Sequence, residues 1–205
     1  MMCRRNQSAK LIQLLFISFC SNLFLSGNFC RAGFFCVMEN NIIFRKANLD
    51  DLDEIFSFVQ KSIVKLIQKK IYQWDEIYPA KYDFESDIIN GWLTCGIIDG
   101  TIVSTYSIND ECDEDYKTAS WNWPDSRWRV LHRIVVNPEF QNQGIGTRTM
   151  SHLINELKKA GIESLRLDVF SENPYSQRMY HKLGFVKTGE AHWRKGLFYL
   201  LEKKL

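Results

Sequence analysis

Two glycines between an apolar strand and a helix form the chemically most suggestive stretch of this chain. The run from Gln141 to Thr147 reads Gln-Asn-Gln-Gly-Ile-Gly-Thr and follows the apolar residues 130–136. At such a turn the first N–H groups of the helix have no intrahelical partner, and the helix dipole adds partial positive charge. Because Gly144 and Gly146 have no Cβ, phosphate oxygens can approach the main chain closely. The turn is therefore a candidate pyrophosphate site.

A second unit of strand and helix supplies two further polar groups. Asn173 can cap the second helix, with Pro174 at its first position, and Tyr180 follows seven residues after the asparagine. The small side chain of Ser176 leaves room beside Tyr180 for a ligand. The glycine turn has no Gly-Lys-Ser/Thr ending and no third glycine, which argues against a nucleoside-triphosphate loop and a dinucleotide fingerprint. An ordinary glycine loop and a half-buried tyrosine are the alternative interpretation.

As an ordered set, these residues resemble the signature of the GNAT-type N-acetyltransferases. The shared positions are the family's Gln/Arg-x-x-Gly-x-Gly/Ala motif and its later Asn, Tyr and Leu-Gly-Phe, here Gln141, Gly144, Gly146, Asn173, Tyr180 and residues 183–185. The resemblance covers about residues 41–205. It implies acetyl-CoA as co-substrate and direct transfer of acetyl to a primary amine in a ternary complex.

The resemblance also implies an α/β (α+β) fold of GNAT type. Its central sheet is mixed and mostly antiparallel, with about seven strands flanked by helices, and is splayed between the fourth and fifth strands. The hydropathy pattern predicts elements in the matching order. Strands are predicted at 42–46, 93–98, 101–108, 130–136, 165–169, 185–190 and 197–202, and helices at 52–67, 84–89, 145–157 and 174–183. In the last helix, Tyr175, Met179 and Leu183 stand four apart and predict its core stripe.

By the same resemblance, the cofactor is held by residues of the fourth strand, the glycine turn and the start of the last helix. These are Ile134, Val135 and Val136 for the pantetheine, Gln141, Asn142, Gln143, Gly144, Ile145, Gly146 and Thr147 for the pyrophosphate, and Asn173 as a supporting residue. Tyr180 is implied as the acid that protonates the departing thiolate. A tyrosine of pKa ~10 and a thiol of ~8.5 are close enough for this transfer.

The base that removes a proton from the amine is left open between two side chains and water. His132 lies in the strand before the glycine turn, and an ordinary pKa of ~6.5 would leave it mostly neutral. Asp168 lies five residues before Asn173, where other members of the family hold a glutamate base. Each has a structural alternative, because His132 can be a satisfied sheet histidine and Asp168 can pair with Arg133 or Arg166.

The acceptor is predicted only as a small-molecule or peptide amine. Two segments expected near its site, 73–79 and 109–128, are rich in acids and aromatic residues, which attract organic cations. A solvated acidic loop is the competing interpretation. Neither Cys95 nor Cys112 has the spacing or the histidine partner of a metal ligand, so no metal is predicted. A non-catalytic CoA-binding regulatory module with the same fold is the alternative function.

Composition predicts one domain with an appendage. The net charge is +2, but residues 1–37 hold four basic residues and no acid. The domain therefore has no basic excess, which argues against a nucleic-acid partner. We interpret 38–205 as the N-acetyltransferase domain, expected in the cytoplasm with acetyl-CoA, and a homodimer as one assembly that the fold permits.

The segment 1–37 is interpreted as a mis-assigned start, because Met38 leads directly into the first predicted strand. A signal or membrane anchor is the alternative, since basic residues precede the apolar run 11–25. That run is shorter than the ~20 residues of a membrane span. No membrane partner is expected unless 1–37 is genuine.

Overall fold

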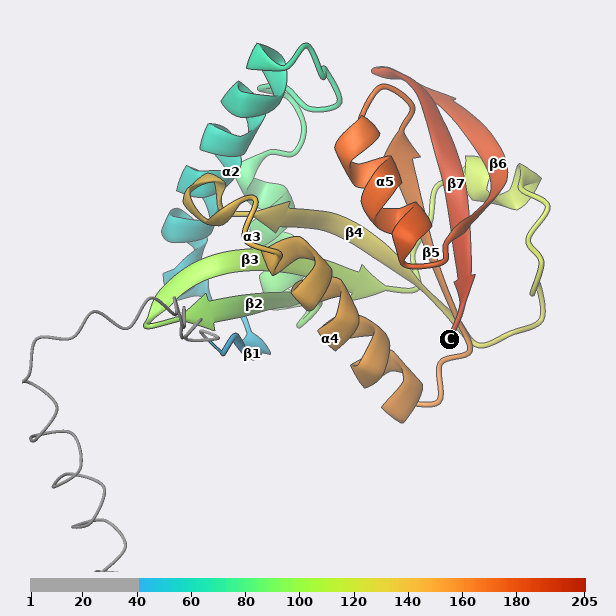
Figure 1. The fold of residues 1–205 in the computed structure, drawn as a ribbon, viewed down its shortest axis with the longest axis horizontal. Coiled ribbons are helices and arrows are strands. Elements are labelled where there is room, and N and C mark those ends of the chain that lie inside the picture. Colours follow the sequence, from blue (N-terminus) through green and yellow to red (C-terminus); the bar gives the residue numbers. More distant parts are fainter. Residues whose placement is uncertain (1–40) are drawn as a thin grey trace, which may run out of the picture. The chain divides into compact units, whose positions relative to one another are not determined.

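The structure, a computed structural model, describes residues 41–205, and the interpretation of 1–37 lies outside them. Within this range seven strands form one sheet in the order β1-β2-β3-β4-β5-β7-β6 (Figure 1). The β4–β5 pair is parallel and the other neighbouring pairs are antiparallel. The predicted mixed, mostly antiparallel sheet is thus confirmed.

The element bounds follow the predicted order closely. The strands are β1 (Ile43–Lys46), β2 (Leu93–Ile98), β3 (Thr101–Asn109), β4 (Trp128–Val136), β5 (Ser164–Phe170), β6 (Val186–Trp193) and β7 (Gly196–Lys204). The α-helices are α2 (Leu52–Gln68), α3 (Lys81–Ile89), α4 (Ile145–Lys159) and α5 (Pro174–Lys182). Short 3-10 turns lie at 49–51, 114–118 and 138–140.

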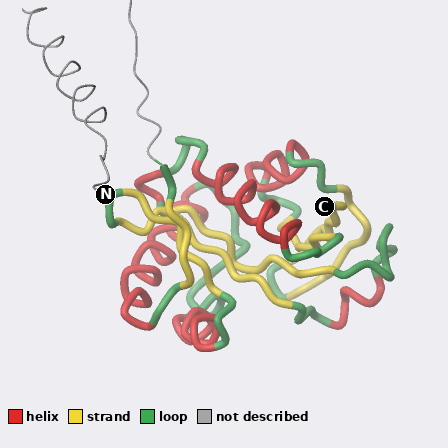
Figure 2. The backbone as a smooth tube through the Cα atoms, turned by 90° about the horizontal axis from the view of Figure 1, so that it is seen from below, coloured by secondary structure: helices red, strands yellow, loops and turns green. Residues whose placement is uncertain are grey.

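Helices cover both faces of the sheet, as the view from below shows (Figure 2). On one face the apolar stripes of α2 and α3 pack on β2 and β3, around Ile55, Phe84 and Leu93. On the other face α4 and α5 pack on β4, β5 and β7, around residues such as Met150 and Leu167. Each amphipathic helix therefore buries one face against the sheet, as its spacing of apolar residues requires.

The sheet opens between β4 and β5. Their parallel pairing runs from Trp128 opposite Ser164 to Leu131 opposite Leu167, and β4 then continues to Val136 without β5 beside it. In Figure 1 the two strands begin side by side and diverge. On its other side β5 pairs with β7 along its whole length, from Ser164 to Phe170. The predicted splay between the fourth and fifth strands is confirmed.

A β-bulge in β4 lies at the start of this opening. On β4 two residues, Arg133 and Ile134, face a single residue of β3, Tyr106. Arg133 has a φ of 44°, which is uncommon for a residue with a side chain. Its guanidinium binds both oxygens of Asp87 on α3, at 2.6 and 2.8 Å. This buried ion pair holds the bulge in its left-handed conformation.

Two local predictions were wrong. The helix predicted from residue 84 begins at Lys81, because Asp83 caps its start by accepting from the main-chain N–H of Ala80 at 2.7 Å. This first turn is polar and gives no apolar periodicity. Tyr175 was placed in the core stripe of α5 but is 56% exposed, and Lys69 of α2 lies over its ring at 4.3 Å. Met179 and Leu183 do pack against the core.

Candidate active site

Two cavities adjoin in the region of the splay. The first, of about 330 Å³, borders the glycine turn and is called the turn cavity. The second, of about 580 Å³, lies where β4 and β5 diverge and is called the splay cavity. Both are lined by Gln73, Trp74, Ile134 and Ser176. The cavities therefore meet at these four residues, so that molecules bound in the two can touch.

The turn cavity collects nearly all residues predicted for the cofactor. Those that line it are Ile134, Val135, Val136, Gln141, Asn142, Gly144, Ile145, Gly146, Thr147 and Asn173. Gln143 is not among its lining residues, and its side chain points to the carbonyl oxygen of Glu139 at 3.4 Å. Asn173 caps α5 as predicted, and its amide also donates to Gln73 at 2.6 Å.

The glycine turn has the backbone that an anion site needs. Gly144 is the N-cap of α4 with a φ of 76°, and no side chain caps the first N–H groups of that helix. A Cβ at Gly146 would lie 3.3 Å from the sulfur of Met179, in the narrow space between α4 and α5. The uncapped amides and the helix dipole together favour a phosphate at this end of α4.

Sequence reasoning missed two lysines beside this cavity. Lys65 in the last turn of α2 and Lys69, the C-cap of that helix, stand four apart and both line the turn cavity. The ammonium group of Lys65 donates to the carbonyl oxygen of Pro138 at 2.9 Å. The four-residue spacing of these lysines indicates that they share one helix face. Nothing in the sequence showed that this face lies beside the glycine turn.

The splay cavity is formed by side chains from many separate segments. Its lining residues from β4, β5 and α5 include Leu131, His132, Arg133, Ile134, Asp168, Val169, Phe170, Ser176 and Tyr180. The α2–α3 connection, the segment before β4 and the β6–β7 hairpin supply most of the others, among them Tyr78, Glu111, Asp113, Tyr116, Trp193 and Lys195. All three residues predicted for catalysis therefore border one cavity.

Asp168 on β5 is one of the carboxylates that line the splay cavity. Oδ1 accepts a hydrogen bond of 2.9 Å from the hydroxyl of Tyr116, a buried residue that sequence reasoning did not single out. Burial raises the pKa of Asp168 to about 6, because the low-dielectric surroundings disfavour its ionised form. At neutral pH the carboxylate is still mostly ionised and able to accept a proton.

His132 on β4 faces hydrogen-bond acceptors. Nε2 lies 2.9 Å from Oδ1 of Asn109 and 3.2 Å from the carbonyl oxygen of Glu111. A ring nitrogen between two acceptor oxygens carries the proton and donates it. Burial, with the nearby charge of Arg133, lowers the pKa of His132 to about 4. The imidazole is therefore neutral, with Nδ1 as its remaining basic atom.

Tyr180 on α5 is buried at the junction of the sheet and the helix, with its ring edge-on to Phe185 at 5.5 Å. Burial, together with the charge of Asp168, raises the pKa of Tyr180 above its ordinary value. Among residues 41–205 no hydrogen-bond partner engages its hydroxyl. That hydroxyl is protonated and available to a ligand in the splay cavity.

The structural alternative that paired Asp168 with an arginine was wrong. Arg133 is turned by the bulge to Asp87, and Arg166 binds Glu202, its direct cross-strand neighbour on β7, at 3.1 Å.

The acids of the segment before β4 divide into two groups. Glu111 and Asp113 line the splay cavity, whereas Glu114 pairs with Lys117 in solvent.

Comparison with known proteins identifies the family. The model of the acetyltransferase (GNAT) family matches residues 61–185, which include the glycine turn, β5 and α5. The chain belongs to this family. Its seven-stranded mixed sheet, opened after Leu131, is the GNAT fold.

Similar proteins agree with this assignment. The GNAT acetyltransferase of Streptococcus agalactiae superposes with a TM-score of 0.70 at 22% identity, covering 80% of this chain and 95% of that one. The PaiA N-acetyltransferase of Thermoplasma acidophilum, solved in complex with coenzyme A, gives a TM-score of 0.61 at 19% identity and covers 80% and 99%. At these identities the likeness shows the fold of this GNAT chain.

A curated relative shares a shorter stretch. The ribosomal protein bS18-alanine N-acetyltransferase of Escherichia coli is 42% identical over 56 residues, which are 27% of this chain and 38% of that protein. The lining of the splay cavity runs from Gln73 to Phe198 and exceeds such a stretch. The similarity therefore does not extend over the whole acceptor side of this GNAT domain.

Residues 41–205 contain neither a candidate membrane-spanning helix nor a candidate metal cluster. None of their helices combines the length and apolar character that crossing a bilayer demands. No group of three or more His, Cys, Asp or Glu side chains in this range could hold a metal ion.

Proposed function

We propose that this GNAT chain is an acetyl-CoA-dependent N-acetyltransferase that acts on a primary amine by direct attack in a ternary complex. The observation that carries the proposal is the meeting of the two cavities at Gln73, Trp74, Ile134 and Ser176. A cofactor with its pyrophosphate on the glycine turn can extend its pantetheine along β4 to this junction. An amine in the splay cavity then reaches the thioester without a covalent enzyme intermediate.

In the proposed reaction the amine nitrogen attacks the carbonyl carbon, the C–S bond breaks, and the products are the acetylated amine and CoA. The amine must first lose a proton, and the thiolate must gain one. A main-chain N–H of β4 at Val135 or Val136 polarises the carbonyl oxygen as it gains negative charge. A cytoplasmic location accompanies the proposal, because acetyl-CoA is a cytoplasmic metabolite.

Tyr180 is proposed as the acid. Its raised pKa keeps the hydroxyl protonated across the working pH range, and the hydroxyl has no competing partner among the described residues. It lines the splay cavity together with Ser176, which also borders the turn cavity. It can therefore reach a sulfur at the junction and donate a proton as the C–S bond breaks.

Asp168 is proposed as the base in preference to His132. The carboxylate lines the splay cavity and is ionised at neutral pH, with a pKa of about 6. The Nε2 atom of His132 is occupied as a hydrogen-bond donor, and its pKa of about 4 makes it the weaker base. The Nδ1 atom of His132 and water are the remaining alternatives.

The proposal is tested by calorimetry with acetyl-CoA and by a thiol-release assay over a panel of amines. We expect saturable binding of acetyl-CoA and CoA release that depends on an amine. Tyr180→Phe should lower turnover by about 10²-fold or more while acetyl-CoA still binds. Tyr82→Phe is the matched control, because Tyr82 is 67% exposed on α3 and should leave turnover unchanged.

Each outcome has a distinct meaning. No heat with acetyl-CoA at millimolar concentration would remove the cofactor assignment. Tight binding without CoA release for any amine would favour the non-catalytic CoA-binding module. Undiminished turnover in Tyr180→Phe would remove the acid assignment alone.

A further inference from the structure

Carboxylates without an ion-pair partner line the splay cavity. Glu111, Asp113 and Asp168 line it, and none of the three forms an ion pair within residues 41–205. Asp168 accepts from the neutral hydroxyl of Tyr116, and Asp113 accepts from the main-chain N–H of Asp115. A ligand in this cavity therefore meets negative charge that the protein itself does not neutralise.

Each cation that lines the same cavity is paired with a carboxylate outside the lining, and because two of them share one carboxylate a single positive charge is left over. Arg133 is held by the buried carboxylate of Asp87 at 2.6 Å. Arg194 and Lys195, in the β6–β7 turn, share the carboxylate of Asp75 at 2.7 and 3.1 Å. A carboxylate on a ligand would have to compete with these pairs, whereas an ammonium group finds acceptors without a partner.

Aromatic side chains form much of the remaining wall. Besides Tyr180, six of them line the splay cavity, from the α2–α3 connection, the segment before β4, β5 and the β6–β7 hairpin: Trp74, Tyr78, Tyr116, Phe170, Trp193 and Phe198. Aromatic rings bury large apolar surfaces and attract cations to their faces. The cavity volume of about 580 Å³ is within the range of sites for one small organic molecule.

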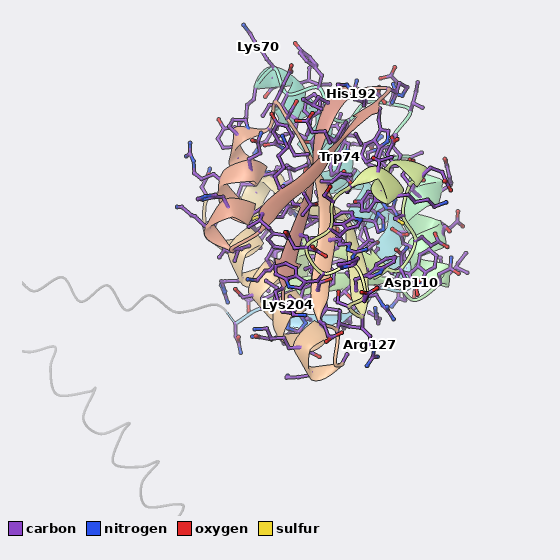
Figure 3. All side chains as sticks on the ribbon, turned by 90° about the vertical axis from the view of Figure 1, so that its right-hand side faces the viewer. Lys70, Trp74, Asp110, Arg127, His192 and Lys204 are labelled. Carbon is purple, nitrogen blue, oxygen red and sulfur yellow. The ribbon has the colours of Figure 1, made fainter. Side chains whose placement is uncertain are left out.

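An ion-pair bridge joins the two segments that border the cavity at one end of the molecule. Asp75 belongs to the α2–α3 connection, and its partners Arg194 and Lys195 belong to the β6–β7 turn. Figure 3 shows the neighbouring residues Trp74 and His192 toward the same end, away from Arg127 and Lys204. A polypeptide lying across these two segments would have to displace the bridge, whereas a small molecule need not.

We propose that the acceptor is a small primary amine with an aromatic body and no carboxylate beside the amine. The inference rests on the proposed function and adds the substrate class. The ammonium group lies at Asp168 and faces Glu111 and Asp113, the body packs between the aromatic walls, and the whole molecule fits inside the bridged cavity. The proton leaves the ammonium for Asp168 before the nitrogen attacks the thioester.

The test compares matched acceptors in the thiol-release assay with the full chain. The acceptors are 2-phenylethylamine, L-phenylalanine, a peptide with an N-terminal phenylalanine, and spermidine. We expect kcat/KM for 2-phenylethylamine to exceed each of the others by about fivefold or more. The carboxylate of L-phenylalanine is repelled by the lining carboxylates, the peptide must displace the bridge, and spermidine has no aromatic ring to pack on the walls. Equal or higher kcat/KM for phenylalanine, the peptide or spermidine would overturn the inference.

A pair of variants tests the charge argument directly. Glu111→Gln with Asp113→Asn should reduce the preference for 2-phenylethylamine over L-phenylalanine several-fold, with acetyl-CoA binding unchanged. Glu114→Gln is the matched control, because Glu114 is an acid of the same segment that pairs with Lys117 outside the cavity. An unchanged preference in the double variant would contradict the charge argument. Failure of acetyl-CoA binding, or no turnover with any amine, would instead overturn the proposed function itself.

Discussion

The turn cavity and the splay cavity differ in what forms their walls. The glycine turn offers main-chain amides, and seven consecutive residues, Gln141 to Thr147, contain the whole motif. The splay cavity is lined by side chains from α5, four strands, the β6–β7 turn and two connections, spread from Gln73 to Phe198. The first can be recognised in one line of sequence, whereas the second exists only after folding. The comparison implies that a substitution in one cavity can impair cofactor binding or turnover without impairing the other.

The largest separate effect is expected at Asp168. Asp168→Asn keeps the shape of the side chain but cannot accept a proton, so kcat/KM should fall by about 10²–10⁴-fold. Binding of acetyl-CoA in the turn cavity should be unchanged. A simultaneous loss of cofactor affinity would break the separation between the two cavities.

The pH dependence sharpens the same prediction. A base acts in its ionised form, so wild-type kcat/KM should fall as pH falls through about 6, the raised pKa of Asp168. The pH profile of the residual activity of Asp168→Asn should not show this fall near pH 6. A fall of kcat/KM near pH 4 that persists in this variant would indicate His132 as the base, since its pKa is lowered to about 4.

Arg133 lines the splay cavity next to Ile134, a residue that both cavities share, and its loss should destabilise the whole domain. Arg133→Met leaves Asp87 buried without its cation, which should cost about 3–5 kcal/mol of unfolding free energy. Urea denaturation measures this loss. Arg45→Met is the control, because Arg45 also binds an aspartate, Asp51, with two hydrogen bonds but is more exposed, and should lose less. Equal losses would show that the bulge has no special dependence on its ion pair.

Gly144 should affect the turn cavity alone. Gly144→Ala places a side chain at a φ of 76°, where the strain is about 1–2 kcal/mol, and moves the amides that face the phosphate. We expect acetyl-CoA to bind about tenfold more weakly. Gly91→Ala is the matched control, with a φ of 70° and equally open space, and should lose similar stability without losing affinity.

The smallest effect is expected at the bridge. Asp75→Asn weakens the contacts with Arg194 and Lys195. Because these two cations are partly exposed, the free energy of unfolding should fall by less than about 1 kcal/mol. The acceptor KM should rise a few-fold with no change in cofactor affinity. Asp53→Asn, in an exposed pair with Lys81, should change neither constant. The ion pairs lower the pKa of Asp75, so the bridge persists above the ordinary aspartate pKa and weakens only in acid.

The sequence predicted the fold and the turn cavity well, for physical reasons. The Asp99-Gly100 turn and its alternating flanks specify a hairpin, and strand, glycines and helix lie next to one another in the chain. The Asn173 cap also followed from local chemistry. Such features depend on neighbours within a few residues, which a sequence displays directly.

The splay cavity could be predicted only in part. Tyr180, His132 and Asp168 were found through motif spacing, but Tyr116 is 52 residues from the aspartate to which it donates. The bridge joins residues 119 positions apart. Arg133 gives no warning of its left-handed backbone, because arginine rarely adopts it. These contacts depend on register and on loop paths that no local pattern encodes.

The hydrogen bond between Asn173 and Gln73 has a consequence for how the protein can change over generations. It fastens the first turn of α5 to the α2–α3 connection at 2.6 Å, and Gln73 borders both cavities. A substitution at Gln73 is therefore expected to change the binding of the cofactor and of the amine together. Residues that touch a single cavity, such as Trp193, are free to vary first, and altered amine preference should arise there.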